Sequence, residues 1–153
     1  MRVQIRPAAA SDIESMKGRF RRADIDELWA AAHKTPEECL EEGMVSSPLC
    51  WTGTVEGLPV AMFGASPACL IGGIGVPWMV GTNELASCAR PMIEMARPVV
   101  DRMLMTFGHL VNYVDARNDK AIRWLKHLGF EFKGAEPYGL ENLPFFRFEM
   151  RRG

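Results

Sequence analysis

The sequence lacks the cysteine and histidine spacings that build metal sites and disulfide frameworks. Four cysteines occur, far apart and without a CxxC pair: Cys39, Cys50, Cys69 and Cys88. That distribution fits neither a zinc site nor a small disulfide-rich fold. The histidines show no HxxxH or HExxH spacing. We therefore expect no metal, and reduced thiols in a cytosolic compartment.

An excess of charge of either sign is also missing. The chain has 18 Lys and Arg against 19 Asp and Glu, a formal net charge of −1. Nothing in this balance predicts binding to nucleic acid or to an acidic membrane. No cleavable signal region opens the chain. These absences exclude several classes of partner but name none.

One uncharged run, residues 57–83, is long enough to span a bilayer, which takes about 20 residues. It is interrupted by Pro59, Pro67 and Pro77 and by several glycines. Such breakers suit short buried strands joined by turns better than one helix. We therefore expect no membrane segment.

The composition is that of a globular protein, because 48% of the 153 residues are hydrophobic and 24% are charged. Residues 3–6 alternate as a strand does. Helical patterns follow over residues 11–20, 25–32 and 36–44, the first with an N-cap at Ser11 or Asp12. Strands are predicted over residues 50–55, 58–63 and 76–80, with Glu56 and Gly57 forming a tight turn.

The second half predicts a helix over residues 89–107, kinked or interrupted by Pro98. Its apolar stripe is formed by Met92, Met95, Val99, Met103 and Leu104. A strand over 110–115, a helix over 118–128 and strands over 130–133 and 145–150 complete the pattern. This order predicts one α/β (α+β) domain over residues 1–153, with a mixed, mostly antiparallel, twisted sheet of about six to seven strands and helices on both faces.

The segment from Asp115 to Phe130 forms a well-marked strand–helix–strand unit. Asn118 is placed to cap the helix. One apolar face follows at i, i+3, i+4 and i+7, made of Ala121, Trp124, Leu125 and Leu128. Gly129 supplies the left-handed residue that ends the helix.

This segment resembles the motif N-x-x-A-x-x-x-Y-x-x-x-G-F of the GNAT N-acetyltransferases, with Leu125 at the tyrosine position. The resemblance implies acetyl-CoA as cofactor, held in a V-shaped gap between the fourth and fifth strands. Met79, Val80 and Gly81 would then meet the pantetheine arm through their backbone. Asn118 and Ala121 would lie near the cofactor, and Arg90 would supply charge beside its phosphates.

Two departures from that family pattern stand out. Residues 82–91, where the family has a glycine-rich pyrophosphate loop, contain no glycine, and Glu84 would repel phosphate unless it is turned away. Leu125 has no proton to give to a departing thiolate, a role that Tyr113 could fill only if its hydroxyl reached the gap. No residue is therefore assigned as catalytic acid or base.

A closer resemblance covers the second half, in the runs at residues 78–82, 112–118, 122–126 and 144–148. These are similar to GNAT-like internal virion or morphogenesis proteins of short-tailed phages. That resemblance implies a virion- or morphogenesis-associated protein in the bacterial host cytoplasm. It would be a degenerate, non-canonical acyltransferase that keeps the fold as a scaffold and acts through contacts with other phage or virion proteins. The alternatives are an active acetyl-CoA-dependent N-acetyltransferase that acetylates an amine, and a CoA-binding regulator without turnover.

Overall fold

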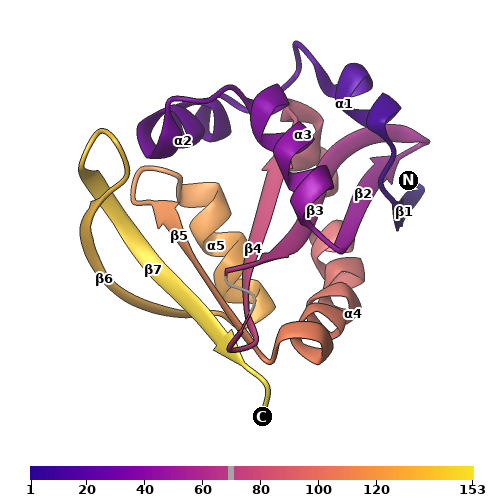
Figure 1. Cartoon of the computed structure of the whole chain (residues 1–153). Helices are drawn as coiled ribbons and strands as arrows, with labels where there is room; N and C mark the ends of the chain where they lie inside the picture. The colour runs from indigo at the N-terminus through magenta and orange to yellow at the C-terminus, as the bar shows by residue number, and fades with distance from the viewer. Residues whose placement is uncertain (69–70) are drawn as a thin grey trace.

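The computed structural model describes residues 1–68 and 71–153 (Figure 1). Within them, seven strands form one sheet in the order β1-β2-β3-β4-β5-β7-β6. The strands are β1 (Val3–Pro7), β2 (Leu49–Val55), β3 (Leu58–Pro67), β4 (Ile74–Gly81), β5 (His109–Asp115), β6 (Glu131–Tyr138) and β7 (Leu143–Arg151). All neighbouring strands are antiparallel except β4 and β5. The predicted mixed, mostly antiparallel sheet is confirmed.

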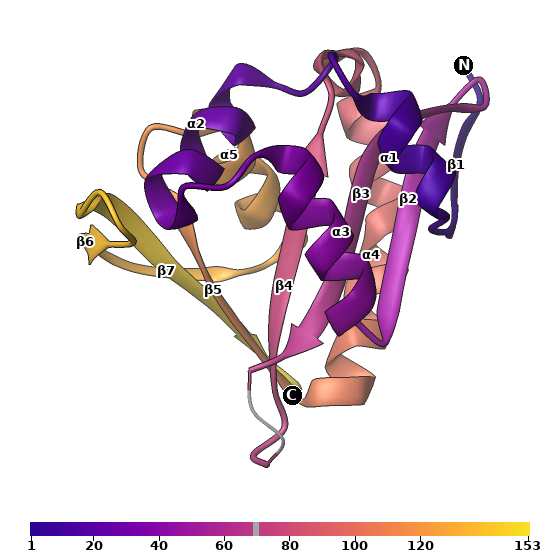
Figure 2. The same ribbon diagram turned by 45° about the horizontal axis from the view of Figure 1, so that its top comes forward.

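Helices cover both faces of the sheet, as predicted. They are α1 (Ala10–Met16), α2 (Arg22–Ala32), α3 (Pro36–Ser46), the 3-10 helix η1 (Asn83–Cys88), α4 (Ala89–Phe107) and α5 (Asp119–Leu128). Figure 2 shows α1, α2 and α3 on one face and α4 and α5 on the other. Each face has its own core, because side chains alternate along a strand: Met62 packs under α1 and α3, and its neighbour Phe63 packs towards α4.

The two parallel strands stay together only at their beginnings. Their paired positions are Ile74 with His109 and Gly75 with Leu110. Beyond these pairs β4 and β5 diverge, and both views show the resulting V (Figures 1 and 2). Backbone groups on the inner edges of the V therefore have no strand to bind. This gap is the feature that positions the candidate site.

The predicted start of the first helix is wrong by two or three residues. The N-cap of α1 is Ala9, not Ser11 or Asp12. The carboxylate of Asp12 lies in the first turn and accepts a hydrogen bond from the Ala9 N–H at 2.9 Å. From the sequence alone, this arrangement cannot be distinguished from an N-cap at Ser11. The helix also ends at Met16, and Phe20 instead forms an isolated β-bridge with Thr82.

Two expectations for α4 are corrected. Of the kink or interruption predicted at Pro98, the interruption is absent, because α4 runs unbroken from Ala89 to Phe107. Met95 is 38% exposed and so lies outside the buried stripe, which contains Met92 and Met103. Strand β6 is also longer than the predicted residues 130–133, because a register shift between Phe132 and Ala135 breaks its alternation while its pairing with β7 continues.

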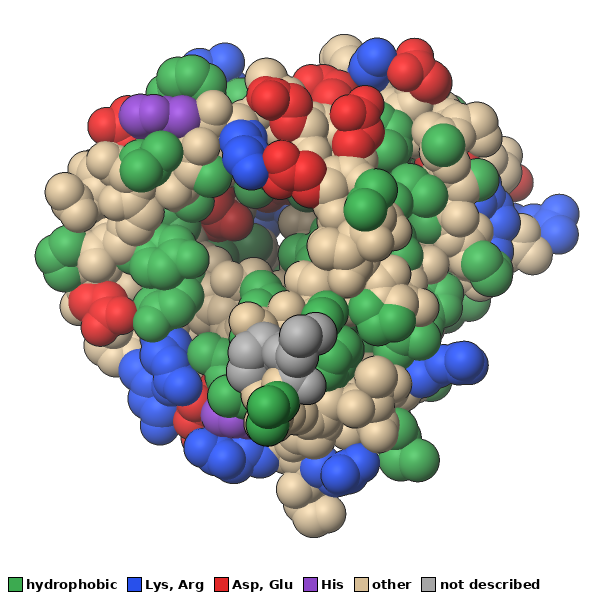
Figure 3. All heavy atoms as spheres, viewed as in Figure 1, with side chains coloured by type: hydrophobic (Ala, Val, Ile, Leu, Met, Phe, Trp, Pro, Cys, Tyr) green, Lys and Arg blue, Asp and Glu red, His purple; other side chains and the backbone are tan. Residues whose placement is uncertain are grey.

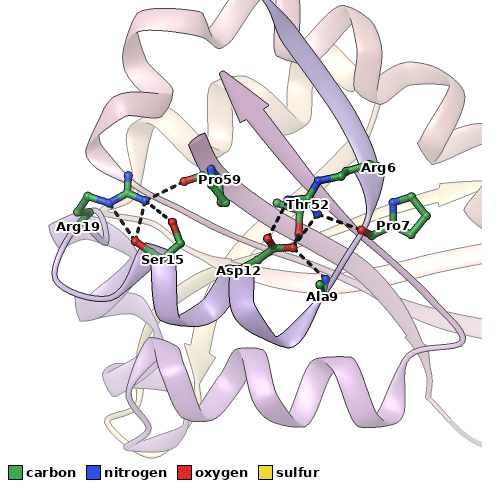
Figure 4. Close-up of polar contacts among 8 residues, drawn as sticks. All are labelled: Arg6, Pro7, Ala9, Asp12, Ser15, Arg19, Thr52 and Pro59. Atoms are coloured by element: carbon green, nitrogen blue, oxygen red, sulfur yellow. Dashed lines mark hydrogen bonds and ion pairs between the residues drawn. The ribbon is translucent and has the colours of Figure 1, made fainter. Parts of the chain in front are cut away.

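Asp12 joins β1, α1 and β2 through a buried cluster of hydrogen bonds (Figure 4). Its carboxylate accepts from the Arg6 guanidinium at 2.8 and 2.9 Å and from the Thr52 hydroxyl at 2.7 Å. Burial alone would raise the pKa of Asp12, but the hydrogen bonds from Arg6, Ala9 and Thr52 hold it below its usual value. Nearby, Arg19 donates to the carbonyls of Ser15 and Pro59 and ties the end of α1 to β3.

No helix within residues 1–68 and 71–153 is long and apolar enough to cross a membrane.

We predict that Asp12→Asn lowers the free energy of unfolding by about 1–3 kcal/mol at pH 7, because charged hydrogen bonds to a buried group are lost. Chemical denaturation measures this change. The contribution of the wild-type carboxylate is present above the ordinary aspartate pKa of 3.8 and is lost as the pH falls through its lowered value. The difference between the two proteins should therefore shrink in acid. The control Glu14→Gln removes an exposed carboxylate and should change stability by less than about 0.5 kcal/mol; equal effects of the two changes would contradict the assigned role of Asp12.

Candidate functional site

The backbone of β4 presents alternate residues to the gap. Thr82 N–H donates to the Val60 carbonyl of β3 at 2.8 Å. In an antiparallel ladder the N–H and carbonyl groups of every second residue point to the same neighbouring strand. Val80 and Trp78 therefore also turn their backbone groups to β3. Gly81, Met79 and Pro77 turn theirs to the gap.

Most of these gap-facing groups are already satisfied. Gly81 N–H donates to the Asp24 carboxylate at 2.9 Å, and the Gly81 carbonyl accepts from Arg21 N–H at 3.0 Å. The Pro77 carbonyl accepts from the Asn112 side-chain amide at 2.6 Å, across the V. Within the described chain, Met79 is left with an N–H and a carbonyl that face the gap and have no partner. It offers one backbone donor for a ligand carbonyl.

Two carboxylates of α2 lie at the open end of the V. Asn118 Nδ2 donates to Asp24 Oδ1 and to Glu27 Oε1, at 3.1 Å each. Glu27 Oε1 also accepts from Asp115 N–H at 3.0 Å. Because Asp24 binds Gly81 and Glu27 binds Asp115, helix α2 holds the carboxyl ends of β4 and β5 at a fixed separation.

Glu27 is poised to exchange a proton near neutral pH. Burial raises its pKa to about 7; the hydrogen bonds from Asp115 N–H and Asn118 lower it, and the charges of Asp24 and Asp115 raise it further. Its second oxygen, Oε2, has no hydrogen-bond partner among the described residues. No sequence motif identifies Glu27. Its three-residue spacing from Asp24 places both carboxylates on one helix face, but only the tertiary structure shows what that face meets.

A cavity of about 110 Å³ lies in the gap and continues between α4 and α5. Its walls are almost entirely apolar and include Met79, Met92, Ala121 and Leu125. Asp24 is the one titratable side chain among the described residues that line it. Leu125 therefore stands in the cavity where the family motif has a tyrosine. Tyr113 does not line it, because its ring stacks on Tyr138 with centroids 4.0 Å apart.

A larger groove of about 620 Å³ opens between η1, the first half of α4, and α5. Its cationic and potentially cationic side chains are Arg21, Arg90, Arg97, Lys120, Arg123 and His127. Among the residues that the structure describes, four of these form no ion pair: Arg90, Arg97, Lys120 and Arg123. Glu94 is the only carboxylate in that lining. Unpaired cations on both sides of a groove suit an anionic ligand.

Trp124 lies where the groove meets the cavity, since its side chain lines both. It is 7% exposed, and its indole Nε1 is buried without a hydrogen-bond partner in the described chain. A buried N–H without an acceptor is costly. This donor marks the junction as a place for a polar ligand atom.

The loop before α4 has no glycine-rich phosphate cradle. Its residues form η1, in which Leu85 N–H already binds the Thr82 carbonyl at 3.1 Å. Glu84, which would repel phosphate if it faced the groove, is instead ion-paired with Arg19. The repulsion expected from Glu84 is therefore largely neutralised. Phosphate binding here would depend on side-chain cations instead of backbone N–H groups.

The six residues predicted to contact a cofactor are divided among these features. Met79 and Ala121 line the cavity, and Arg90 lines the groove. Gly81 and Asn118 belong to the network around Asp24. Val80 lies apart, with its side chain in the core under α1 and α3 and its backbone bound to β3.

Within the described residues, no group of three His, Cys, Asp or Glu side chains is placed to hold a metal ion. Cys39, Cys50 and Cys88 are free thiols, and burial raises the pKa of Cys39 and Cys50 to about 11. Cys69 lies outside the described residues.

On the face seen in Figure 3, the surface is hollowed between α2 and α3, and acidic side chains gather along the upper rim of the hollow. The basic groove lies on the opposite side, with α4 and α5 (Figure 2). The gap between β4 and β5 thus lies between two approaches, one on each face of the sheet. An anionic ligand and a second reactant could reach it from opposite sides.

The sequence matches no protein-family profile and no curated protein. The structure, in contrast, is similar to solved acetyltransferases. An N-acetyltransferase from Staphylococcus aureus Mu50 superposes with a TM-score of 0.74 at 13% identity, with 99% of each chain covered. A GNAT superfamily phosphinothricin acetyltransferase from Sinorhizobium meliloti, solved with AcCoA, gives 0.75 at 15% identity, over 100% of this chain and 90% of that one.

Spermidine N-acetyltransferase from Vibrio cholerae, solved with CoA and spermine, gives a TM-score of 0.71 at 12% identity, covering 97% of this chain and 95% of that one. Identities this low establish the fold and not the activity. The gap between β4 and β5, the helices on both faces and the similarity over nearly the whole chain agree: the protein has the fold of the GNAT N-acetyltransferases.

Proposed function

We propose that the protein binds a coenzyme A thioester and transfers its acyl group, acetyl in the simplest case, to an amine. The observation that carries this proposal is the basic groove with its four unpaired cations, which leads past Trp124 to the free N–H of Met79. Solved proteins of the same fold contain AcCoA or CoA, which supports the choice of ligand.

The positive charges of the groove suit the phosphates of a coenzyme A thioester. Arg90, Arg97, Lys120 and Arg123 would hold its phosphates, since guanidinium and ammonium groups bind phosphate oxygens strongly. Trp124 Nε1 would donate to a polar atom of the arm that passes it. When bound, the thioester supplies an acyl group already activated for attack by an amine.

The chain's own groups can then assist the transfer at the gap. Met79 N–H is placed to donate to a carbonyl oxygen, where a fixed backbone donor stabilises developing negative charge. Glu27 Oε2 has no partner among the described residues and could accept the proton of the attacking amine, and a carboxylate whose pKa is about 7 suits that role. As the C–N bond forms the C–S bond breaks, and the CoA thiolate would take its proton from solvent on release, because Leu125 supplies none. Asn118 and Asp115 N–H hold the other oxygen of Glu27. The apolar wall around Leu125 keeps water away from the reacting atoms.

The virion- or morphogenesis-associated role stays a separate proposal, supported by the likeness of the second half to phage proteins. It differs from the enzyme proposal because it requires contacts with other virion proteins and no ligand in the groove. Mass spectrometry of purified particles tests it, and absence of the chain from the particles would count against it.

We predict that CoA and acetyl-CoA bind to the groove with an affinity that depends on its cations. Arg97→Gln and Arg123→Gln should each weaken binding about tenfold, which corresponds to about 1.4 kcal/mol, as measured by calorimetry. The matched control Arg22→Gln removes an exposed arginine that pairs with Asp26 outside the groove, and it should leave the affinity unchanged. Absence of binding at millimolar CoA would rule out both the enzyme and the CoA-binding regulator.

We predict that kcat/KM for acyl transfer to an amine rises with pH and reaches half its maximum near pH 7. This parameter reports the ligand-free protein, in which Glu27 must lose its proton to act as base. Glu27→Gln should lower the rate by about 10²–10⁴-fold while the affinity for CoA is retained. Exposed Glu14 provides the matched control, Glu14→Gln, with wild-type rates. An unchanged pH profile in Glu27→Gln would remove Glu27 from the mechanism.

Glu27 also gives a prediction that is independent of activity. Its pKa is raised from 4.5 to about 7 in the folded protein, so the folded state holds the proton more tightly than the unfolded state. The free energy of unfolding of the wild type, relative to that of Glu27→Gln, should fall as the pH rises from 4.5 to 7. Denaturation of both proteins across this range measures it, and a constant difference would show that Glu27 titrates normally.

A further inference from the structure

Arg21 lies between the basic groove and the carboxylates of α2. Its side chain lines the groove, yet the residue is only 9% exposed. One guanidinium nitrogen donates to Asn118 Oδ1 at 3.0 Å and lies 3.8 Å from Asp24 Oδ1. Asn118 in turn donates to Glu27 at 3.1 Å. A single side chain, Asn118, therefore separates the groove cation from the proposed base.

The chemistry of these groups fixes the direction of the chain of hydrogen bonds. A guanidinium only donates, so Arg21 requires the oxygen of the Asn118 amide. The nitrogen of that amide must then face the carboxylates of Asp24 and Glu27. Asn118 is 2% exposed and its oxygen also caps α5 by accepting from Ala121 N–H. The amide cannot reverse without breaking contacts at both ends.

The charges around Glu27 make Arg21 the cation that a groove ligand can reach. From α2, Glu27 faces Asp24; from the end of β5 it faces Asp115, and both charges raise its pKa. Arg117 follows β5, but its guanidinium is bound to both oxygens of Asp115. Among the residues that the structure describes, only Arg21 both contacts this cluster and lines the groove.

We propose that Arg21 is a positioning residue that couples an anion in the groove to the protonation of Glu27 through Asn118. A bound phosphate neutralises Arg21, and the loss of its positive field favours the protonated form of the carboxyl group. Glu27 is then a stronger base when the donor is in place than when the groove contains only water. The coupling deepens the proposed function and rests on Glu27 being the base in that reaction.

The test is a carboxyl ¹³C NMR titration of Glu27 in the full chain, with its signal assigned by its absence in Glu27→Gln. Inorganic pyrophosphate serves as the probe, and calorimetry shows separately whether it binds. In the wild type, saturating pyrophosphate should raise the midpoint of the titration by about 0.5–1 pH unit, the size expected for a charge several ångströms away. An unchanged midpoint at saturation overturns the proposal.

Arg21→Gln removes the cation and supplies the decisive comparison. Its midpoint without ligand should already be raised, and pyrophosphate should add little further shift. Arg97→Gln is the matched control, because Arg97 lines the groove but does not belong to the hydrogen-bonded chain from Arg21 to Glu27. In this variant pyrophosphate should bind more weakly, and the ligand-free midpoint should stay at the wild-type value. A full pyrophosphate-induced shift in Arg21→Gln would contradict the assignment to Arg21.

Two further outcomes are distinguishable. If Arg21→Gln does not fold, as judged by circular dichroism, Arg21→Lys tests the charge alone. It should keep the ligand-free midpoint and most of the pyrophosphate-induced shift; loss of the shift while pyrophosphate still binds overturns the coupling. If pyrophosphate and CoA do not bind the wild type at all, the proposed function fails. In that case a wild-type ligand-free midpoint in Arg21→Gln overturns the coupling, and a raised one supports it.

Discussion

The short pairing of β4 with β5 is the constraint on which the site depends. After two paired positions the strands separate, and backbone groups that a continuous sheet would satisfy must find other partners. Side chains from distant parts of the chain take up most of them: Asp24 at Gly81 and Asn112 at Pro77. Met79 is left free. The arrangement that holds the gap open therefore also defines where a ligand can bind.

Helix α2 places charged side chains beside this gap. It brings Asp24 and Glu27 against the carboxyl ends of the two diverging strands, and Arg21, just before it, balances part of their charge. The same region contains the N-cap of α5, Asn118. Local helix capping, the spacing of the strands and the protonation of Glu27 thus share one hydrogen-bonded network, so a change at one member affects the others.

In the groove, side-chain cations stand where a glycine-rich loop would offer backbone N–H groups to a phosphate. The segment before α4 has no glycine and its backbone is folded into η1, so it offers few free N–H groups. Cations from α4 and α5 stand around the groove instead. Glu84, which looks unfavourable in the sequence, is paired with Arg19 from the end of α1. Residues 82–91 alone do not show that side-chain cations take the place of loop N–H groups, because most of those cations belong to α4 and α5.

The sequence by itself determined the order of elements, the mixed sheet and the Asn118-to-Gly129 helix with its caps. These follow from local patterns of apolar residues and capping groups, which act over a few residues. The start of α1 departed from expectation because Asp12 binds the Ala9 N–H from inside the first turn. Strand β6 departed because its pairing with the distant β7 continues past a register shift. Only the tertiary structure revealed Glu27 as a candidate base and Arg21 as its neighbour across Asn118. Asn118 follows Asp24 by 94 positions in the sequence, and burial, which raises the pKa of Glu27, exists only once the chain has folded.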